Sequence, residues 1–225
     1  MEEFDWENNV ENKEEKLKVA KKIVSRVKDN DIIGFGSGST SYITILEIAK
    51  KVKNDNLNIK AIPTSKIISN LCEKLGIKVT SLEENKPDWC FDGADEVDKN
   101  NWLIKGMGAA LYKEKLNFKA SNENYVLVDS TKFVDRLGIN HPVPVECDEE
   151  KQELVKQELI KLGATKVYLK MSNNDDTKPL ITDNGKVILH AWFDEIKADF
   201  EEKIRNIPGV LESGLFIGYN ITIIK

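Results

Sequence analysis

The first half of the chain alternates short apolar runs with longer segments of helical periodicity, and this alternation limits the possible folds more than any other feature. The apolar runs predict strands at 31–36, 58–62, 77–82, 88–92 and 124–129. Helical spacing is found in the segments 39–52, 65–76 and 108–118. Strands that are joined through helices pair in parallel, because the crossover returns the chain to the same end of the sheet. We therefore predict an α/β fold with a Rossmann-like parallel sheet and helices on both faces.

The pattern changes after about residue 140. Two prolines keep the segment 141–146 extended, and 149–163 has the spacing of an amphipathic helix. Asn184-Gly185 is typical of a hairpin turn, and 194–209 predicts a second helix. These features predict a small α+β domain that contains an antiparallel sheet and two helices.

The two patterns together predict two domains. The small α+β domain would span residues 141–207 and serve in oligomerisation. The Rossmann-like domain would combine 1–140 with 208–225, because the last segment offers strands that could return to the first sheet. A chain of 225 residues is long enough to bury a substantial core.

Charge and cysteine content argue against several classes of protein. The net charge is -5 and the Lys and Arg residues are spread along the chain, which disfavours nucleic acid as the main partner. Three cysteines without a Cys-x-x-Cys spacing do not fit a disulfide framework or a structural zinc site. No apolar run is long enough for a membrane span, and the polar, acidic N-terminus is unlike a signal peptide. We expect a cytoplasmic protein with no membrane partner.

A glycine-rich stretch, GFGSGST at 34–40, lies between the first predicted strand and the following helix. Glycines let backbone N–H groups approach an anion closely, and a helix N-terminus adds partial positive charge. The hydroxyl groups of Ser37, Ser39 and Thr40 could donate further hydrogen bonds. The spacing differs from both the dinucleotide fingerprint and the P-loop. The stretch predicts either a phosphate or carboxylate site or a tight turn that needs glycine for its own geometry.

Acids and a lysine surround two further glycine turns. Asp92 and Asp95 flank a Gly-Ala pair at the end of a predicted strand, where ligands collect in open α/β sheets. The same carboxylates could instead cap a turn. The stretch KGMG at 105–108 precedes the helix that carries Glu114, which the local sequence alone would place on the surface. Because the chain has only two histidines, neither in a triad or metal spacing, we expect a carboxylate as any general base.

Six stretches follow one another along the chain: GFGSGST, DGADEVD, IKGMGAAL with a later EK, VLVDSTKFVDRLG, HPVPVE and NIPGVLESGLF. In their order and spacing, the chain resembles ribose-5-phosphate isomerase of the A type from about Lys16 onward. The combination of Asp-Gly-Ala-Asp-Glu with Lys-Gly-x-Gly is specific, whereas one stretch alone would not be. The chain departs from the family at Ser37, where Thr is common, and at Met107, where Gly is common.

The resemblance implies an aldose–ketose isomerase of the non-oxidative pentose phosphate pathway. It would interconvert D-ribose 5-phosphate and D-ribulose 5-phosphate through a cis-enediolate, without a metal or organic cofactor, as a homodimer or homotetramer. By position, Glu114 would carry the proton between C2 and C1. The residues Asp92, Asp95 and Lys105 would handle ring opening, the hydroxyl protons and the developing oxyanion. The implied substrate-binding residues are Ser37, Gly38, Ser39, Thr40, Gly93, Ala94, Gly106, Met107, Gly108, Lys132 and Lys16.

General chemistry supports these roles independently of the resemblance. Removal of a proton next to a carbonyl needs a base close to the carbon and a fixed positive partner for the enediolate oxygen. A solvated Glu has a pKa near ~4.3, so the base would benefit from a desolvated cleft that raises its pKa toward neutrality.

Other functions share parts of this pattern. A deaminase or lactonase of the same sugar-phosphate superfamily would be expected to have a histidine in its catalytic region, but residues 30–130 contain none. A non-catalytic sugar-phosphate sensor would usually carry a helix-turn-helix unit, for which the N-terminal part is too short and too acidic. A coenzyme A transferase-like protein would have its catalytic Glu in another motif. The isomerase is the first hypothesis among these.

Overall fold

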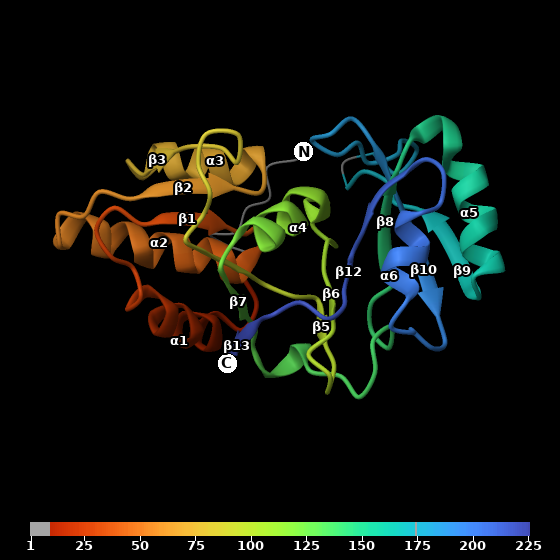
Figure 1. Ribbon diagram of the computed structural model, residues 1–225, viewed down its shortest axis with the longest axis horizontal. Coiled ribbons are helices and arrows are strands. Elements are labelled where there is room, and N and C mark those ends of the chain that lie inside the picture. Colours follow the sequence, from red (N-terminus) through yellow and green to blue (C-terminus); the bar gives the residue numbers. More distant parts are fainter. Residues whose placement is uncertain (1–9, 174) are drawn as a thin grey trace. The chain divides into compact units, whose positions relative to one another are not determined.

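The computed structural model describes residues 10–173 and 175–225, and its contacts divide the chain into two compact units (Figure 1). The parallel-sheet unit contains the described residues up to 93, together with 113–131 and 220–225. The antiparallel unit contains 94–112 and the described residues of 132–219. Residues 1–9, which the predicted Rossmann-like domain includes, lie outside the described residues. Within the residues that the structure describes, no helix is long and apolar enough to cross a membrane.

The parallel-sheet unit is built on six strands in the order β13-β7-β4-β1-β2-β3, and all neighbouring strands are parallel. The strands are β1 (Ile32–Phe35), β2 (Lys60–Pro63), β3 (Lys78–Val79), β4 (Trp89–Asp92), β7 (Glu123–Leu127) and β13 (Thr222–Ile224). The helices are α1 (Lys13–Val24), α2 (Ser39–Asn54), α3 (Lys66–Lys74) and α4 (Leu111–Ala120), of which residues 113–120 belong to this unit. The predicted alternation of strands and helices is therefore confirmed.

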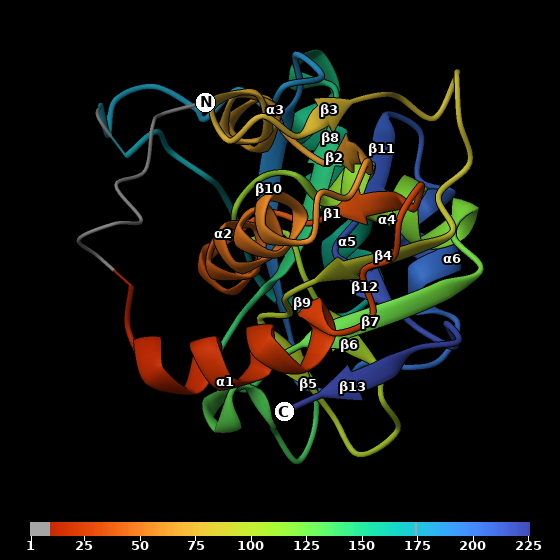
Figure 2. The same ribbon diagram turned by 90° about the vertical axis from the view of Figure 1, so that its left-hand side faces the viewer.

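Helices cover both faces of the six-stranded sheet (Figure 2). Apolar side chains of α1, α2 and α3 form one buried cluster with Ile33 and Phe35 of β1. Successive strand residues point to opposite faces, so Gly34 faces the other side, where α4 lies. A Cβ on Gly34 would be 3.1 Å from the Asn117 amide nitrogen, and that nitrogen donates to the Ile62 carbonyl at 2.9 Å. The α4 helix therefore packs closely on this face because Gly34 has no side chain.

The antiparallel unit contains two small sheets. Four strands pair in the order β11-β8-β10-β9, namely β8 (Val143–Cys147), β9 (Ala164–Leu169), β10 (Val187–Phe193) and β11 (Val210–Ser213). Three shorter strands pair as β12-β6-β5, namely β5 (Glu96–Val97), β6 (Leu103–Ile104) and β12 (Leu215–Phe216). Apolar residues of α5 (Gln152–Lys161) and α6 (Phe200–Arg205) share one core with the four-stranded sheet. A short 3-10 turn, η2 (Glu149–Lys151), precedes α5, and another, η1 (Ser130–Lys132), lies where the chain passes from the parallel-sheet unit into this one. The predicted antiparallel sheet with two helices is confirmed.

Several predicted boundaries differ from the structure. The fourth helix begins at Leu111 rather than 108, because Ala109 has a φ of 65° and breaks the helical backbone. The last helix covers only Phe200–Arg205 of the predicted 194–209. Of the C-terminal strands, only β13 returns to the parallel sheet, while β11 and β12 pair in the antiparallel unit. The predicted domain boundaries stay a prediction.

Candidate active site

The glycine loop begins where β1 and β4 end side by side. The register pairs Phe35 with Phe91, and the Gly36 N–H donates to the Phe91 carbonyl at 2.9 Å. A Cβ on Gly36 would lie 2.2 Å from the Asp92 carboxyl carbon and 2.6 Å from its Cα. Real Cβ atoms do not approach that closely, so this position requires glycine. The missing side chain is what lets Asp92 lie against the loop.

Hydrogen bonds fix the carboxylate of Asp92, which is buried. Its Oδ1 accepts from the Ser41 hydroxyl at 3.2 Å and from the Gly93 N–H at 2.8 Å. The second bond caps the turn after β4, as one of the two sequence interpretations suggested. Sequence reasoning missed Ser41, although the run of hydroxyl residues at the start of α2 could have indicated it.

The N-terminus of α2 has the properties of an anion site. Gly38 is the N-cap with a φ of 103°, and a Cβ on it would meet nothing within 4 Å. The first turn of this 16-residue helix contains no acidic residue. Lys16, on α1, is buried, and its Nζ donates to the Ser39 hydroxyl at 2.9 Å. A helix N-terminus, a lysine and open space therefore coincide in one unit, which favours a phosphate or carboxylate ligand.

Two hydroxyl residues after β2 support the same loop. The Ser37 hydroxyl lies 2.7 Å from the Thr64 hydroxyl and donates to Ser65 at 3.0 Å. Sequence reasoning missed Thr64 and missed this contact of Ser65, which it considered only as a helix cap. A signal was present, because β1 and β2 are parallel neighbours and their carboxyl ends meet at one edge. Ser65 is also the predicted cap of α3, since its side chain accepts from the Ile68 N–H.

Glu114 lies on the buried side of α4, with only 4% of the residue exposed. Leu111, Glu114, Lys115 and Phe118 are all buried, and they recur at the spacing of one helix face. The surface location expected from the local sequence is therefore wrong. The two lysines that flank Glu114 in the sequence suggested a solvated position, whereas the apolar residues at helical spacing around Glu114 indicated burial.

The turn after β6 contains the predicted lysine in the antiparallel unit. The Lys105 N–H donates to the Gly214 carbonyl at 2.9 Å, and a Cβ on Gly214 would be 2.1 Å from the Lys105 carbonyl. Lys105 is buried, and its Nζ lies 5.6 Å from the centre of the Phe216 ring, within the range of a cation–π contact. The β12 segment therefore holds both the backbone and the ammonium group of this lysine.

Asp95 fixes the next peptide of the same turn. Its Oδ2 accepts from the Met107 N–H at 3.1 Å, and the Met107 carbonyl accepts from the Lys170 Nζ. Gly106 has a φ of 97° and Ala109 a φ of 65°, so the turn uses left-handed backbone at two positions. The Met107 side chain is partly exposed and does not prevent this turn. Glycine at 107 is therefore not a requirement of the backbone conformation.

The structure distributes the predicted site residues between the two units. The parallel-sheet unit contains Lys16, Ser37, Gly38, Ser39, Thr40, Asp92, Gly93 and Glu114. The antiparallel unit contains Ala94, Asp95, Lys105, Gly106, Met107, Gly108 and Lys132. Hydrogen bonds connect Asp92 to the start of α2 in the first unit, and Asp95 to the 105–108 turn in the second. Lys132 ends η1 and is half-buried.

One acid of the DGADE stretch has a different role. Glu96 is buried, and its carboxylate accepts from the backbone N–H groups of Gly138, Asn140 and His141 at 2.6, 2.6 and 2.8 Å. Three such bonds tie the chain before β8 to β5. At least one acid of this dense stretch therefore has a structural role.

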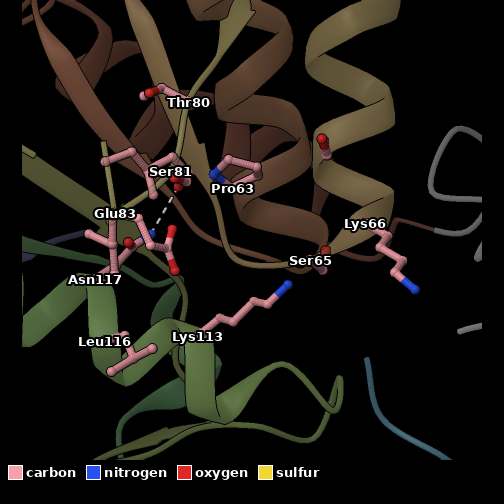
Figure 3. Close-up of a pocket in the computed structure, with 12 residues that line it drawn as sticks. Pro63, Ser65, Lys66, Thr80, Ser81, Glu83, Lys113, Leu116 and Asn117 are labelled. Carbon is pink, nitrogen blue, oxygen red and sulfur yellow. Dashed lines mark hydrogen bonds between the residues drawn. The ribbon is translucent and has the colours of Figure 1, made fainter. Parts of the chain in front are cut away.

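A cavity of about 300 Å³ lies in the parallel-sheet unit, between the end of β2, α3, residues 80–83 and α4 (Figure 3). Lys113 extends from α4 toward Ser65 in this cavity. The α4 residues that line it are Lys113, Leu116 and Asn117, so the carboxylate of Glu114 is not part of the lining. Glu83 also lines it, and a hydrogen bond from Ser81 lowers the pKa of the Glu83 carboxyl. The cavity combines cations with an anion, and Ser65 in its lining accepts from the Ser37 hydroxyl of the glycine loop at 3.0 Å.

Comparison with known proteins identifies the family. The sequence model for ribose 5-phosphate isomerase A (phosphoriboisomerase A) matches residues 60–225. Ribose-5-phosphate isomerase A of Synechococcus sp. is 43% identical over 207 residues, which cover 90% of this chain and 88% of that protein. The protein of the same name from Methanothermobacter thermautotrophicus is 40% identical over 205 residues, covering 90% of this chain and 89% of the other.

Solved structures agree with the sequence comparison. The structure of ribose 5-phosphate isomerase A from Methanocaldococcus jannaschii has a TM-score of 0.91 and 36% sequence identity, and the alignment covers 96% of both chains. A ribose 5-phosphate isomerase from Plasmodium falciparum has a TM-score of 0.87 at 31% identity, with 93% of this chain and 92% of that chain covered. As its sequence motifs predicted, this chain belongs to the ribose 5-phosphate isomerase A family.

Proposed function

We propose that this chain is a ribose-5-phosphate isomerase that interconverts D-ribose 5-phosphate and D-ribulose 5-phosphate through a cis-enediolate. Its membership of the family supports the reaction. The structural observation that carries the proposal is the acid-free N-terminus of α2, where Lys16 donates to Ser39 in the unit that also contains Glu114. A phosphate site and a buried carboxylate are the two groups that such a substrate needs.

The phosphate would bind at the loop of Ser37, Gly38, Ser39 and Thr40. The backbone N–H groups and hydroxyls of this loop would donate to the phosphate oxygens, and Lys16 would add positive charge. A solved D-ribose-5-phosphate isomerase with a TM-score of 0.90 and 36% identity is in complex with phospho-erythronic acid. That protein binds a phosphorylated sugar acid, which supports a phosphate site in this chain. In the proposal, Lys132 contributes further charge for the phosphate.

Glu114 would act as the general base. In the direction from aldose to ketose, its carboxylate removes the proton from C2 while the carbonyl oxygen O1 receives a proton, which gives the enediol or enediolate. The protonated Glu114 then returns its proton to C1, and O2 loses its proton to become the ketone oxygen. Burial of Glu114 keeps competing water away from the carboxylate, and this favours proton transfer to carbon.

Three other charged groups would manage the oxygens. Lys105 would stabilise negative charge that develops on the enediolate, because a fixed cation acts most strongly where water is excluded. Asp92 and Asp95 would exchange protons with the ring oxygen and the hydroxyl groups during ring opening and transfer. Gly93, Ala94, Gly106, Met107 and Gly108 would contribute backbone contacts to the sugar.

The proposal includes no metal ion and no organic cofactor. It also includes a homodimer or homotetramer in the cytoplasm, with neither nucleic acid nor membrane as partner. The three cysteines are buried and form no disulfide with one another, which is compatible with a reducing compartment.

Proton NMR tests the proposed function directly. Purified protein is incubated with D-ribose 5-phosphate and EDTA in deuterium oxide, and we expect signals of ribulose 5-phosphate, with solvent deuterium at the carbon that receives the proton. Line broadening of the sugar phosphate without product would instead favour a sensor, or a deaminase or lactonase with another substrate. Activity that disappears with EDTA and returns with a divalent metal would contradict the cofactor-free reaction.

A further inference from the structure

Lys170 is the first residue after β9, and its ammonium group reaches the turn that carries Lys105. Its Nζ donates to the Met107 carbonyl, and Lys170 is also close enough to Asp95 for the two charges to interact. The Met107 N–H, on the other side of the same residue, donates to Asp95 at 3.1 Å. A cation and an anion therefore hold the two backbone polar groups of Met107.

The backbone of Lys170 is itself fixed on both sides. Its N–H donates to the Ile188 carbonyl at 2.8 Å, and its own carbonyl accepts from the Leu180 N–H at 2.9 Å. The adjoining strand β9 pairs with β10, so Lys170 directly follows a hydrogen-bonded strand. A side chain on a fixed backbone loses less freedom when it binds, and it can position a partner accurately.

The surroundings of Lys170 keep the interaction with the turn strong. Burial lowers the pKa of Lys170, and the nearby Asp95 carboxylate raises it again. His190 is also near: burial lowers its pKa to about 4, and the charges of Lys170 and His141 contribute in the same direction. A neutral imidazole adds no positive charge that would repel the Lys170 ammonium group. Hydrogen bonds from charged donors in such partly desolvated places are stronger than those in water.

We propose that Lys170 is a positioning residue of the isomerase reaction, which holds the Met107 carbonyl so that the 105–108 turn keeps Lys105 and Asp95 in their reactive arrangement. This inference rests on the proposed function. The turn needs such support because Ala109, which is not a glycine, has left-handed backbone with a φ of 65°. Released from Lys170, the Met107 peptide can rotate, and Asp95 loses the fixed N–H that orients its carboxylate.

The test compares two variants at Lys170 with one variant on strand β9. Lys170→Met removes the ammonium group and keeps an apolar chain, and we expect kcat to fall about 10- to 100-fold while KM changes less than about threefold. Lys170→Arg restores a cationic donor and should recover most of the lost kcat. Lys166→Met is the matched control, because Lys166 is exposed on the same strand, with its Nζ 5.0 Å from the centre of the Tyr168 ring. It should have wild-type kinetics.

Amide hydrogen exchange at Met107 provides an independent readout that does not require turnover. Exchange of this N–H should be faster in Lys170→Met and close to the wild-type rate in Lys170→Arg. If Lys170→Met does not fold, Lys170→Gln, which keeps a neutral donor, takes its place. Wild-type kcat in the neutral variant, or an Arg variant as impaired as the neutral one, would overturn the inference. A wild-type protein without isomerase activity would refute the proposed function, and the exchange rates would still show whether Lys170 holds the turn.

Discussion

The glycine loop at 36–40 and the turn at 105–109 both precede a helix, but different parts of the chain support them. The loop is supported by neighbouring strands of one parallel sheet, since its contacts come from Phe91, Asp92 and Thr64 at strand ends. The turn is supported from far along the chain: Lys170 lies 63 residues from Met107, and Gly214 is more distant still. A parallel sheet thus assembles a site at one edge by its topology, whereas the turn depends on individual long-range contacts.

The two regions also use glycine for different reasons. Gly36 is required by contact, because Asp92 occupies the space of a side chain. Gly106 has both a positive φ of 97° and a Leu111 Cβ 2.6 Å from where its own Cβ would be. Gly108 has open space around its missing Cβ. Glycines that look equivalent in the sequence therefore differ in how much the fold depends on them.

The substitution with the largest expected effect distinguishes the group that transfers the proton from the groups that bind the phosphate. Glu114→Gln keeps the size of the side chain but removes the base, so kcat should fall by roughly 10²- to 10⁴-fold. Competitive inhibition by inorganic phosphate should be unchanged, because the proposed phosphate site at Gly38 does not contain Glu114. Steady-state kinetics with and without phosphate measure both quantities.

The control for that substitution is Glu73→Gln, which removes an exposed carboxylate from α3. It should leave kcat and phosphate inhibition at wild-type values. Near-normal turnover in Glu114→Gln would reject Glu114 as the base, and the chemistry would then have to be assigned to another carboxylate.

The next effect concerns the steric difference between the two glycine regions. Gly36→Ala places a methyl group against the backbone and carboxylate of Asp92, and we expect it to lower the free energy of unfolding by about 1–3 kcal/mol. Gly108→Ala is the matched comparison, and it should change the unfolding free energy by less than about 0.5 kcal/mol. Urea unfolding at one pH measures both. Equal effects of the two substitutions would show that close packing at Gly36 is not the cause.

The prediction with the smallest expected effect concerns a buried acid, Glu146, which lies in the antiparallel unit and outside the predicted site. Glu146 on β8 is fully buried, and it lies opposite Glu212 on β11. Its Oε1 accepts from Thr182 at 2.6 Å and from Asn184 at 2.9 Å, whereas its Oε2 has no partner among the described residues. Burial raises the pKa of the Glu146 carboxyl above 4.5, and the Glu212 charge adds to this. The folded protein therefore holds this proton more tightly than the unfolded chain does.

This difference makes the contribution of Glu146 to stability depend on pH. The contribution is complete below the ordinary pKa of 4.5 and is lost as the pH rises through the raised value. Glu146→Gln cannot ionise, so we expect it to be more stable than the wild type at pH 7 by about 1 kcal/mol and to lose that advantage at pH 4. Urea unfolding across this range measures it, with the exposed Glu150→Gln as control. An advantage of the same size at both pH values would contradict the raised pKa.

The sequence determined the features that depend on local order. Apolar runs and helical spacing specified the order of strands and helices in the parallel sheet, because both periodicities are properties of neighbouring residues. The glycine loop before α2 was visible for the same reason, since a strand, a turn and a helix start follow one another there. The sequence motifs also predicted the family, although the roles of Glu114, Asp92, Asp95 and Lys105 stay predictions.

Only the tertiary structure decided which groups meet across the chain. The burial of Glu114 was misjudged, because its charged neighbours in the sequence are not its neighbours in space. Ser41 contacts Asp92 and Lys170 contacts Met107, and no local sequence pattern assigned these partners. Asp95 and Glu96 are adjacent acids of one motif. Glu96 accepts from the backbone before β8, whereas Asp95 accepts from the backbone of the 105–108 turn. Such pairings follow from strand order, register and packing, which connect residues far apart and are therefore not encoded in any short stretch.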